Sequence, residues 1–304
     1  GSQIIGMGKD LFLNHHIAKQ VFEEVDETLN LKLSKIIFEG PLEKLTHTPN
    51  TQPALMAVSM AIVKVLEFEL KSKIFQLADI ILGHSLGEYC ALCSLGAISL
   101  KDTTLLLKIR GEAMQNAVKN LDTKMMAVIG MEINDVEMVI NDNKLPNNEV
   151  CEIANDNCPG QVILSGTEKG LDFFSDLLKQ KGARTLIELK VSAPFHCSLM
   201  KSASEIMQKK MNSIKLNELQ ARFISNVTAD FEEDVEEIKR LLVRQIYSRV
   251  RWRESVIKSS QELNEIIEIG SGKVLTGMSK RINKSLKCQN ISNLEEIEIF
   301  LNQY

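Results

Sequence analysis

The chain has 304 residues, of which 44% are hydrophobic and 25% are charged, and its formal net charge at pH 7 is -4. This acidic balance argues against nucleic acid as the main partner and gives no reason to expect a membrane surface. No run of about 18 apolar residues is evident, so a transmembrane helix is not expected. The length suffices for one large domain or two unequal ones.

The six cysteines are informative about the cellular compartment of the protein but do not indicate a metal or disulfide site. Cys90 and Cys93 have the CxxC spacing, but they lie in an apolar helical pattern in which cysteine behaves as a small buried side chain. No second pair or histidine cluster completes a zinc site, so we expect no metal. A disulfide framework would be denser in cysteine, and the first residues lack the basic and apolar segments of a signal peptide. We therefore expect a reduced, cytoplasmic protein.

The first part of the chain is expected to be helical. Apolar residues recur at helical spacing over three segments, which are residues 6–17, 18–29 and 52–70. In the third segment Pro53 suits the first turn of the helix, and Asn50 or Thr51 is available as its cap.

A strand and two helices are predicted next. Residues 77–82 predict a short buried strand, and residues 86–95 predict the helix that follows it. Residues 99–118 predict another helix, with Ser99 or Asp102 as its cap.

The pattern changes near Asp122. Six segments then follow in the order strand, helix, strand, strand, helix, strand, at residues 124–131, 133–143, 148–156, 160–166, 167–182 and 183–192. This order is that of the ferredoxin-like split β-α-β motif. We therefore expect a ferredoxin-like subdomain at 122–190, inserted into a larger α/β domain formed by 1–121 and 191–304.

Helices and strands continue to alternate in the last part of the chain. Helical patterns cover residues 196–214, 234–263 and 273–286, and strand patterns cover residues 221–230 and 264–272. Strands separated by helices imply a mostly parallel sheet that is covered on both faces.

The stretch from Gly83 to Gly87, Gly-His-Ser-Leu-Gly, matches the nucleophile-elbow pattern G-x-S-x-G. The glycines permit a sharp turn between the predicted strand and helix, which leaves the Ser85 hydroxyl exposed at a helix N-terminus. The helix dipole there favours negative charge, so the Leu86 N–H is a candidate oxyanion donor. The alternative is that Ser85 only caps a helix.

A serine nucleophile needs a base, and the chain has five histidines. Two lie in a predicted surface helix, one lies in a polar loop, and His84 is too close in the elbow to turn toward its neighbour's hydroxyl. His196 follows a strand and a proline at a strand-to-helix junction, so elimination favours it as the base. No acidic residue stands out as a third member of a triad.

Seven motifs carry a resemblance to a known family. In chain order they are "TQPAL" (51–55), "GHSLGEY" (83–89), "IRGEAMQ" (109–115), "NCPGQVILSG" (157–166), "APFHCSLM" (193–200), "LVRQIY" (242–247) and "EIGSGKVLTGM" (268–278). Together they resemble the bacterial malonyl-CoA:acyl carrier protein transacylases, the FabD-type acyltransferases of fatty acid synthesis, over essentially the whole chain. The resemblance implies an α/β-hydrolase-like large domain with an inserted ferredoxin-like subdomain.

The resemblance also implies a reaction and its residues. Ser85 would accept a malonyl group from malonyl-CoA, and His196 would act as its base. The Gln245 backbone carbonyl would orient that histidine, and Arg110 would bind the malonyl carboxylate. Spacing alone would instead pair Arg110 with Glu112 or another nearby acid on a helix surface.

Further residues are implied at the pocket and its rim. Gln52 would line the pocket, Phe195 would favour malonyl over a branched acyl group, and Asn157 and Gln161 are binding candidates. The acceptor would be the phosphopantetheine thiol of an acidic acyl carrier protein, with no bound cofactor. Basic residues near the cleft are candidates for docking this partner, namely Arg184, Lys190, Lys280 and Arg281. We expect a monomer.

The sequence departs from the family at its start. The family begins with a strand and "PGQGSQ", whereas this sequence begins with the last three residues of that motif, Gly1-Ser2-Gln3. We expect the strand and the first glutamine, whose N–H would be the second oxyanion donor, to precede these residues in nature.

Two other functions remain open on the sequence. A serine esterase or thioesterase would use the same elbow and base with water as acceptor, but it would have no use for Arg110. A catalytically silent module that binds a carrier protein is the second alternative, and intact Ser85, His196 and Arg110 argue against it.

Overall fold

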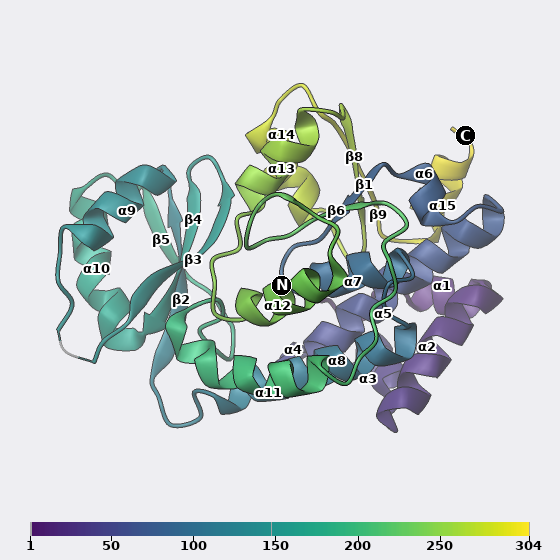
Figure 1. Ribbon diagram of the computed structural model, residues 1–304, viewed down its shortest axis with the longest axis horizontal. Helices are drawn as coiled ribbons and strands as arrows, with labels where there is room; N and C mark the ends of the chain where they lie inside the picture. Colours follow the sequence, from purple (N-terminus) through teal and green to yellow (C-terminus); the bar gives the residue numbers. More distant parts are fainter. Residues whose placement is uncertain (1, 147, 304) are drawn as a thin grey trace.

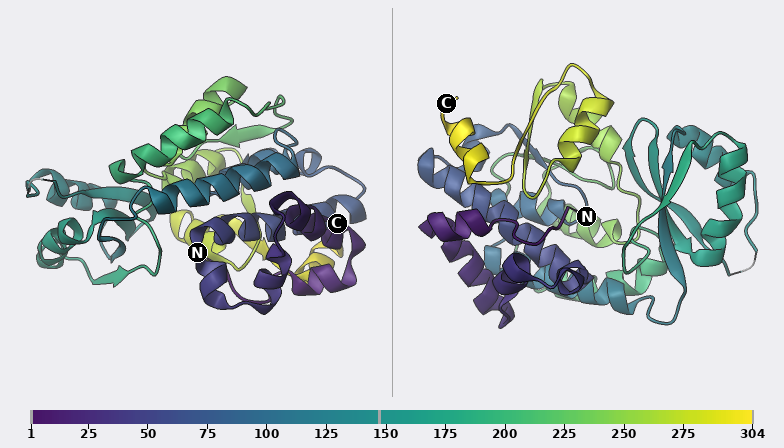
Figure 2. Two further views of the ribbon diagram at one scale, coloured as in Figure 1. Left: turned by 90° about the horizontal axis from the view of Figure 1, so that it is seen from below. Right: turned by 180° about the vertical axis from the view of Figure 1, so that it is seen from behind.

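The computed structural model of the protein describes residues 2–146 and 148–303 (Figure 1). Gly1, Asn147 and Tyr304, which belong to the predicted N-terminal motif, subdomain and large domain, lie outside the described residues. The described chain has a mixed α/β fold with three separate sheets. The four-stranded sheet and its helices extend to one side of the remaining elements, as Figure 2 shows.

The first part of the chain is helical, as the apolar spacing predicts. Its helices are α1 (Lys9–Asn14), α2 (His16–Leu29), α3 (Leu33–Glu39), α4 (Leu42–Thr46) and α5 (Thr48–Glu69). The predicted start of α5 is wrong, because the helix begins at Thr48 and encloses Asn50 and Thr51. Pro49 occupies the first turn, where its missing N–H breaks no intrahelical bond, and Pro53 lies inside the helix.

Helix α5 is the central core helix. By length and composition it could span a membrane, with a mean hydropathy of 1.3 over its most apolar window, although polar residues interrupt its apolar sequence. However, 78% of that window is buried inside the protein. The helix packs against α2 and α8 (Leu100–Asn116), so its apolar surface is covered by other helices.

The elbow follows a short strand. After α6 (Ile74–Leu77) come β1 (Ile80–Leu82) and α7 (Gly87–Ser94). β1 is shorter than predicted because Leu77 ends α6. The predicted helix at 99–118 is confirmed as α8, and the Ser99 hydroxyl accepts a hydrogen bond from the Asp102 N–H at its start.

The six predicted elements after Asp122 are present in the predicted order. They are β2 (Thr123–Ile129), α9 (Ile133–Asn141), β3 (Cys151–Cys158), β4 (Gln161–Thr167), α10 (Glu168–Gln180) and β5 (Thr185–Glu188). The strands pair antiparallel in the order β3-β4-β2-β5. A core that includes Val128, Val136, Leu164 and Phe174 lies between this sheet and its two helices.

The last part of the chain differs from the expectation of one mostly parallel sheet. Its elements are η1 (Ser198–Met200), α11 (Lys201–Met211), β6 (Arg222–Ile224), β7 (Phe231–Glu232), α12 (Val235–Gln245), α13 (Trp252–Ser260), β8 (Glu265–Ile269), α14 (Val274–Ile282), β9 (Lys287–Ile291) and α15 (Leu294–Leu301). Parallel pairing is divided between two small sheets, β1-β6-β7 and β8-β9. The predicted strand at 221–230 is shorter because the chain turns after Ile224 and returns antiparallel as β7.

The pairing of β1 with β6 positions the candidate site. The two strands are parallel, with Leu82 opposite Ile224 at their carboxyl ends. Because carboxyl ends of parallel strands lie at one edge of a sheet, the elbow after β1 and the turn after β6 are brought together.

Candidate active site

Ser85 lies on a sharp turn between β1 and α7. Its φ of 54° is in the left-handed region, which is strained for a residue other than glycine. Gly83 allows the turn to close, since a Cβ added there would lie 2.0 Å from the Gly87 carbonyl carbon. The geometry is that of a nucleophile elbow, with the serine at the start of a helix.

His196 lies beside the Ser85 hydroxyl. Its Nε2 is 2.8 Å from Ser85 Oγ, and its Nδ1 is 2.8 Å from the Gln245 carbonyl oxygen. A carbonyl can only accept, so Nδ1 carries the proton and Nε2 is free to accept from the serine. Burial, together with the positive charge of Arg110, lowers the pKa of His196 to about 3. The imidazole is therefore neutral and able to take a proton.

Arg110 is a buried guanidinium directed at the same hydroxyl. Its side chain donates to Gln52 Oε1 at 2.7 Å, to Gln245 Oε1 at 2.8 Å and to Ser85 Oγ at 3.1 Å. The residue is only 2% exposed, and no described carboxylate lies within ion-pair distance of it. Burial lowers the pKa of Arg110 from its usual value. The pocket thus holds a cation whose hydrogen-bond partners are all neutral.

The neighbouring glycine explains how Arg110 reaches the pocket. A Cβ added at Gly111 would lie 2.6 Å from Pro49 Cα, so glycine lets α8 approach α5 closely at this point. This approach places Arg110 against Gln52 of α5. The alternative surface pairing is absent, because Glu112 pairs with Lys108 at 3.6 Å.

Two residues of the site were not found by the sequence analysis. The Asn226 side chain accepts a hydrogen bond from the Ser85 N–H at 2.7 Å and donates to the Gly83 carbonyl at 2.7 Å. Glu88 accepts from the Asn226 N–H at 2.5 Å and from the Gln245 side-chain amide. Burial raises the pKa of Glu88 to about 8.

No local signal in the sequence marks Asn226, which falls inside the strand predicted at 221–230. It lies two residues after strand β6 ends at Ile224, and β6 is the parallel neighbour of the strand that precedes Ser85. Among the described residues, Glu88 makes no hydrogen bond or ion pair with His196; its carboxylate accepts from the Gln245 side-chain amide, which also donates to the Ser85 carbonyl at 2.9 Å.

The remaining predicted pocket residues lie at different distances from Ser85. Asn157 Oδ1 is 3.0 Å from His84 Nε2, so it contacts the residue next to the serine. Phe195 precedes His196 and packs against both the main core and a smaller core under the antiparallel sheet. Gln161 lies at the β3–β4 turn, where its Oε1 is 3.5 Å from Arg281 Nη1. Among the described residues, the Leu86 N–H has no hydrogen-bond acceptor.

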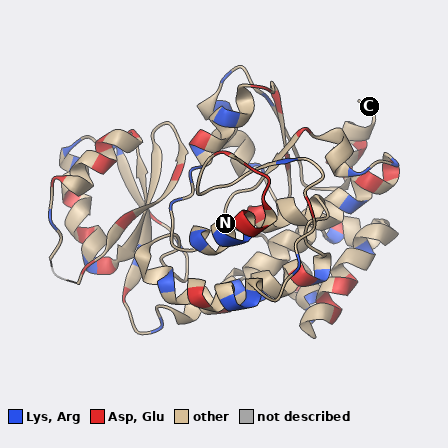
Figure 3. Cartoon of the chain, viewed as in Figure 1, with Lys and Arg blue, Asp and Glu red and all other residues tan. Residues whose placement is uncertain are grey.

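The four predicted docking residues do not form one cluster. Arg281 of α14 donates to the Pro159 carbonyl at 2.7 Å, and Arg184 lies across the same turn against Gly130. Lys280 neighbours Arg281 on α14, whereas Lys190 lies beyond the opposite end of β5. Figure 3 shows acidic and basic residues interspersed along α10, α11 and α12.

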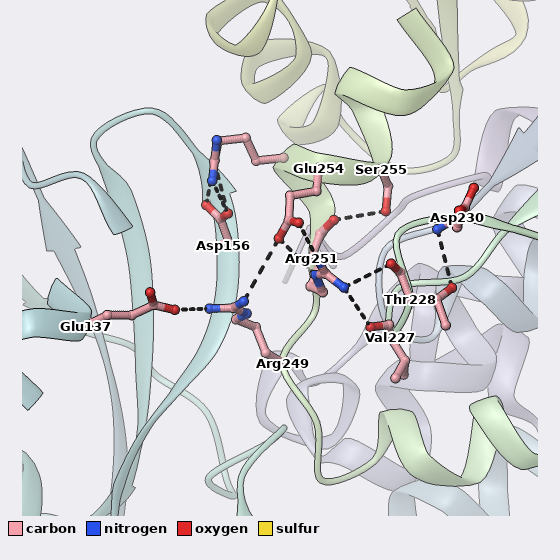
Figure 4. Close-up of polar contacts among 10 residues, drawn as sticks. Glu137, Asp156, Val227, Thr228, Asp230, Arg249, Arg251, Glu254 and Ser255 are labelled. Carbon is pink, nitrogen blue, oxygen red and sulfur yellow. Dashed lines mark hydrogen bonds and ion pairs between the residues drawn. The ribbon is translucent and has the colours of Figure 1, made fainter. Parts of the chain in front are cut away.

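A second group of arginines joins the antiparallel sheet to the rest of the protein (Figure 4). Arg249 pairs with Glu137 of α9 at 2.5 Å, and Arg253 pairs with Asp156 of β3, with Nη2 and Oδ2 at 2.8 Å. Between them, the Val250 N–H donates to the Ala154 carbonyl at 2.8 Å. We call residues 249–253 the arginine strap.

The described residues contain no group of three or more His, Cys, Asp or Glu side chains that could hold a metal ion. The six cysteines are all free thiols, and burial raises the pKa of Cys93 to about 11.

Comparison with known proteins places the geometry in context. Residues 1–297 match the profile of the acyl transferase domain family. The malonyl CoA-acyl carrier protein transacylase of Bacillus subtilis is 44% identical over 300 residues, covering 98% of this chain and 93% of that protein.

Solved structures give the same result. An acyl-carrier-protein-S-malonyltransferase from Bartonella henselae matches with a TM-score of 0.92 and 46% identity, covering 100% of this chain and 96% of that one. A malonyl-transacylase solved in complex with a type II PKS acyl-carrier protein matches with a TM-score of 0.94 and 33% identity, covering 100% and 97%.

Proposed function

Because the chain belongs to the malonyl-CoA:acyl carrier protein transacylase family of acyl transferase domains, we propose that it transfers malonyl groups from malonyl-CoA to an acyl carrier protein. The protein is an acyltransferase that supplies malonyl units for fatty acid synthesis. We further propose specific roles for the residues around Ser85.

In our proposal Ser85 is the nucleophile and His196 is the general base. The supporting contact is the 2.8 Å separation between Ser85 Oγ and His196 Nε2. The Gln245 carbonyl holds the histidine in the tautomer that accepts the serine proton. The Leu86 N–H, at the start of α7, stabilises the oxyanion of the tetrahedral intermediate.

The single observation that carries the choice of substrate is Arg110. A buried guanidinium that lies 3.1 Å from the serine and contacts no carboxylate is suited to an acyl group that brings its own carboxylate. Gln52 holds one end of this guanidinium. Malonyl fits this arrangement, since its free carboxylate lies two carbons from the thioester carbonyl.

The reaction proceeds in two halves. In the first, the Ser85 oxygen bonds to the malonyl carbonyl carbon and the C–S bond of malonyl-CoA breaks, while His196 passes the serine proton to the CoA thiolate. In the second, the phosphopantetheine thiol of the carrier protein gives its proton to His196, and its sulfur bonds to the malonyl carbonyl carbon. The ester C–O bond to Ser85 then breaks, and His196 returns the proton to Ser85 Oγ. No bound cofactor is needed for either half.

We also propose roles for residues that line the pocket and its rim. Phe195 restricts the space beside the α-carbon and so favours malonyl over a branched acyl group. Asn157 orients the substrate next to His84, and Gln161 contacts the phosphopantetheine arm at the rim. Arg184 and Arg281 lie on either side of the β3–β4 turn and receive the acidic carrier protein together with Lys280, which precedes Arg281 on α14. Lys190 contributes from the other end of β5.

We also propose a domain organisation. Residues 122–190 form a ferredoxin-like subdomain, and the element order and antiparallel pairing β3-β4-β2-β5 support this assignment. Residues 1–121 and 191–304 form an α/β-hydrolase-like domain, which the strand-elbow-helix geometry at Ser85 supports. The protein acts as a cytoplasmic monomer without membrane attachment.

Intact-protein mass spectrometry tests the proposed function. Wild-type protein and Ser85→Ala are incubated briefly with malonyl-CoA and then mixed with holo acyl carrier protein. A malonyl adduct is expected on the wild type alone, and the carrier protein is expected to remove it. Transfer of malonyl to water instead of carrier protein, or an adduct that persists in Ser85→Ala, would contradict the proposal.

A further inference from the structure

We propose that Asn226 is the positioning residue of the elbow, and that its side-chain amide holds Ser85 in its strained conformation. This inference rests on the proposed role of Ser85 as nucleophile. It adds a residue that acts on the nucleophile through the backbone and does not itself touch substrate.

The side chain of Asn226 spans the elbow. Its Oδ1 accepts from the Ser85 N–H at 2.7 Å, and its Nδ2 donates to the Gly83 carbonyl at 2.7 Å. One planar amide thus bonds the peptide groups on both sides of His84. Because Ser85 has a φ of 54°, its backbone needs such contacts to remain in this conformation.

The surroundings fix Asn226 in turn. The residue is fully buried; its N–H donates to Glu88 Oε1 at 2.5 Å, and its carbonyl accepts from the Arg251 N–H at 3.0 Å. The Arg251 side chain also donates to the Thr228 carbonyl at 2.9 Å, which holds the turn that begins with Asn226 (Figure 4). Asn226 is therefore a rigid support and not a mobile side chain.

Only a side chain with one donor and one acceptor fits this position. An ionised carboxylate in place of the amide would accept from the Ser85 N–H but would repel the Gly83 carbonyl oxygen. A protonated carboxyl group would restore both hydrogen bonds, because its O–H replaces the Nδ2 donor. The Asn226→Asp variant is therefore expected to regain a native elbow when its introduced carboxyl group is protonated.

The charges around the position determine where this protonation occurs. Burial favours the protonated form of an introduced carboxyl group. Glu88, whose own pKa burial raises to about 8, is itself a neutral acid over most of the range from pH 5 to 8 and adds like-charge repulsion only toward pH 8. The cations Arg110 and Arg251 oppose this protonation, whereas burial lowers the pKa of both His84 and His196 and so disfavours a positive charge on either ring. The complete burial of the position is expected to raise the pKa of the introduced group above that of an exposed aspartate.

The test uses a fluorophosphonate probe, which labels an activated serine without any malonyl chemistry. At about pH 8, Asn226→Asp is expected to label Ser85 on the order of 10- to 100-fold more slowly than wild type. Toward about pH 5 the ratio of the two rates is expected to approach one. Malonyl-CoA acylation is measured in parallel, and its kcat is expected to fall while KM changes little, since Arg110 and Gln52 are untouched.

Asn217→Asp is the matched control. The Asn217 side chain also donates to a glycine carbonyl, that of Gly96 at 3.1 Å, but the residue is exposed and remote from Ser85. Its labelling rate is expected to equal that of the wild type at every pH.

Several results would overturn the inference. One is that Asn226→Asp is labelled at the wild-type rate at about pH 8, and another is that its labelling rate is reduced by the same factor at all pH values. A third is that the variant fails to fold at about pH 5, where its protonated side chain offers the same donor and acceptor as asparagine. Asn226→Ala removes both hydrogen bonds without adding charge, so its deficit should persist at every pH. If the probe results hold but malonyl-CoA does not acylate the wild type, the proposed substrate is wrong and the role of Asn226 stands.

Discussion

Arg110 in the pocket and Arg253 in the arginine strap differ in whether a carboxylate neutralises their charge. Arg253 pairs with the buried carboxylate of Asp156 through two nitrogens, with distances of 2.8 to 3.0 Å. Arg110 is more deeply buried, yet its hydrogen bonds go to two glutamine amides and a serine hydroxyl. The charge of Arg253 is already neutralised within the fold, whereas that of Arg110 is available to a ligand.

This difference separates a structural ion pair from a binding site. A buried cation without a counter-ion destabilises the folded state, and a substrate carboxylate that enters the pocket relieves the imbalance. A bidentate pair within the fold gains nothing from a ligand but is costly to break. The two arginines should therefore respond in opposite ways to substitution, one in activity and the other in stability.

Arg110→Met should produce the largest effect on activity. Loss of the charge-assisted hydrogen bonds to the malonyl carboxylate is expected to lower kcat/KM for malonyl-CoA on the order of 10²- to 10³-fold. The free energy of unfolding should change by less than about 1 kcal/mol or increase, because an uncompensated buried charge is removed. Steady-state kinetics and urea unfolding measure the two effects, and a large loss of stability would contradict the comparison.

Arg253→Ala should show the reverse pattern. It leaves Asp156, which is 1% exposed, without its cationic partner, so the free energy of unfolding should fall by about 3 kcal/mol. Urea unfolding measures this change, and removal of Asp156 in the same chain should recover part of it. Arg240→Ala is the control: the Arg240 side chain is 62% exposed and pairs with Glu237, so its effect should stay within about 0.5 kcal/mol.

The pH dependence of serine labelling tests whether the charge of Arg110 lowers the pKa of His196. The pKa of His196 is lowered to about 3 by burial and by the charge of Arg110, so its neutral form persists as the pH falls below its usual value of 6.5. Fluorophosphonate labelling of the wild type should therefore decline only well below that pH. In Arg110→Met the decline should move up toward 6.5. A wild-type decline centred on 6.5 would show that His196 is not perturbed in this way.

The lowered pKa of His196 also makes the free energy of unfolding depend on pH. In the unfolded chain His196 binds a proton near pH 6.5, whereas in the folded protein its buried imidazole binds a proton only near pH 3. The unfolded state therefore gains a proton first, and His196 lowers the free energy of unfolding as the pH falls from 6.5 toward 3.

Phe195→Ala should have the smallest effect. Removing the ring opens space beside the acyl α-carbon, so the ratio of methylmalonyl to malonyl acylation should rise on the order of tenfold. Competition between the two CoA esters, read by intact mass, measures the ratio. Preference for a carboxylated acyl group should remain, since Arg110 is unchanged.

The sequence predicted best those elements that are defined by local signals. The helix at α8 has the Ser99 cap and α10 has the Thr167 cap, and the apolar spacing of both is regular. The start of α5 was missed because two prolines occur four residues apart and only one of them marks the first turn. The division of the parallel strands into two sheets has no local signal, because strand pairing depends on distant segments.

The candidate site was predictable only in part for the same reason. Elimination among five histidines pointed to His196, and the structure places its ring beside Ser85. The position of Arg110 came from the family resemblance, since spacing alone favoured a surface pair. Asn226 and Glu88 act through hydrogen bonds that close only when β1 and β6 lie side by side, so no local pattern identifies them.

The most direct test of the account is a competition between malonyl-CoA and acetyl-CoA at equal concentration, read as the mass of the adduct on Ser85. The wild type should carry malonyl almost exclusively, because the proposed role of the Arg110 guanidinium is to bind the carboxylate that acetyl lacks. Arg110→Met should lose this preference and carry mainly acetyl. Equal acylation of the wild type by both esters, or an unchanged malonyl preference in Arg110→Met, would contradict the claim that Arg110 is held unpaired for the substrate.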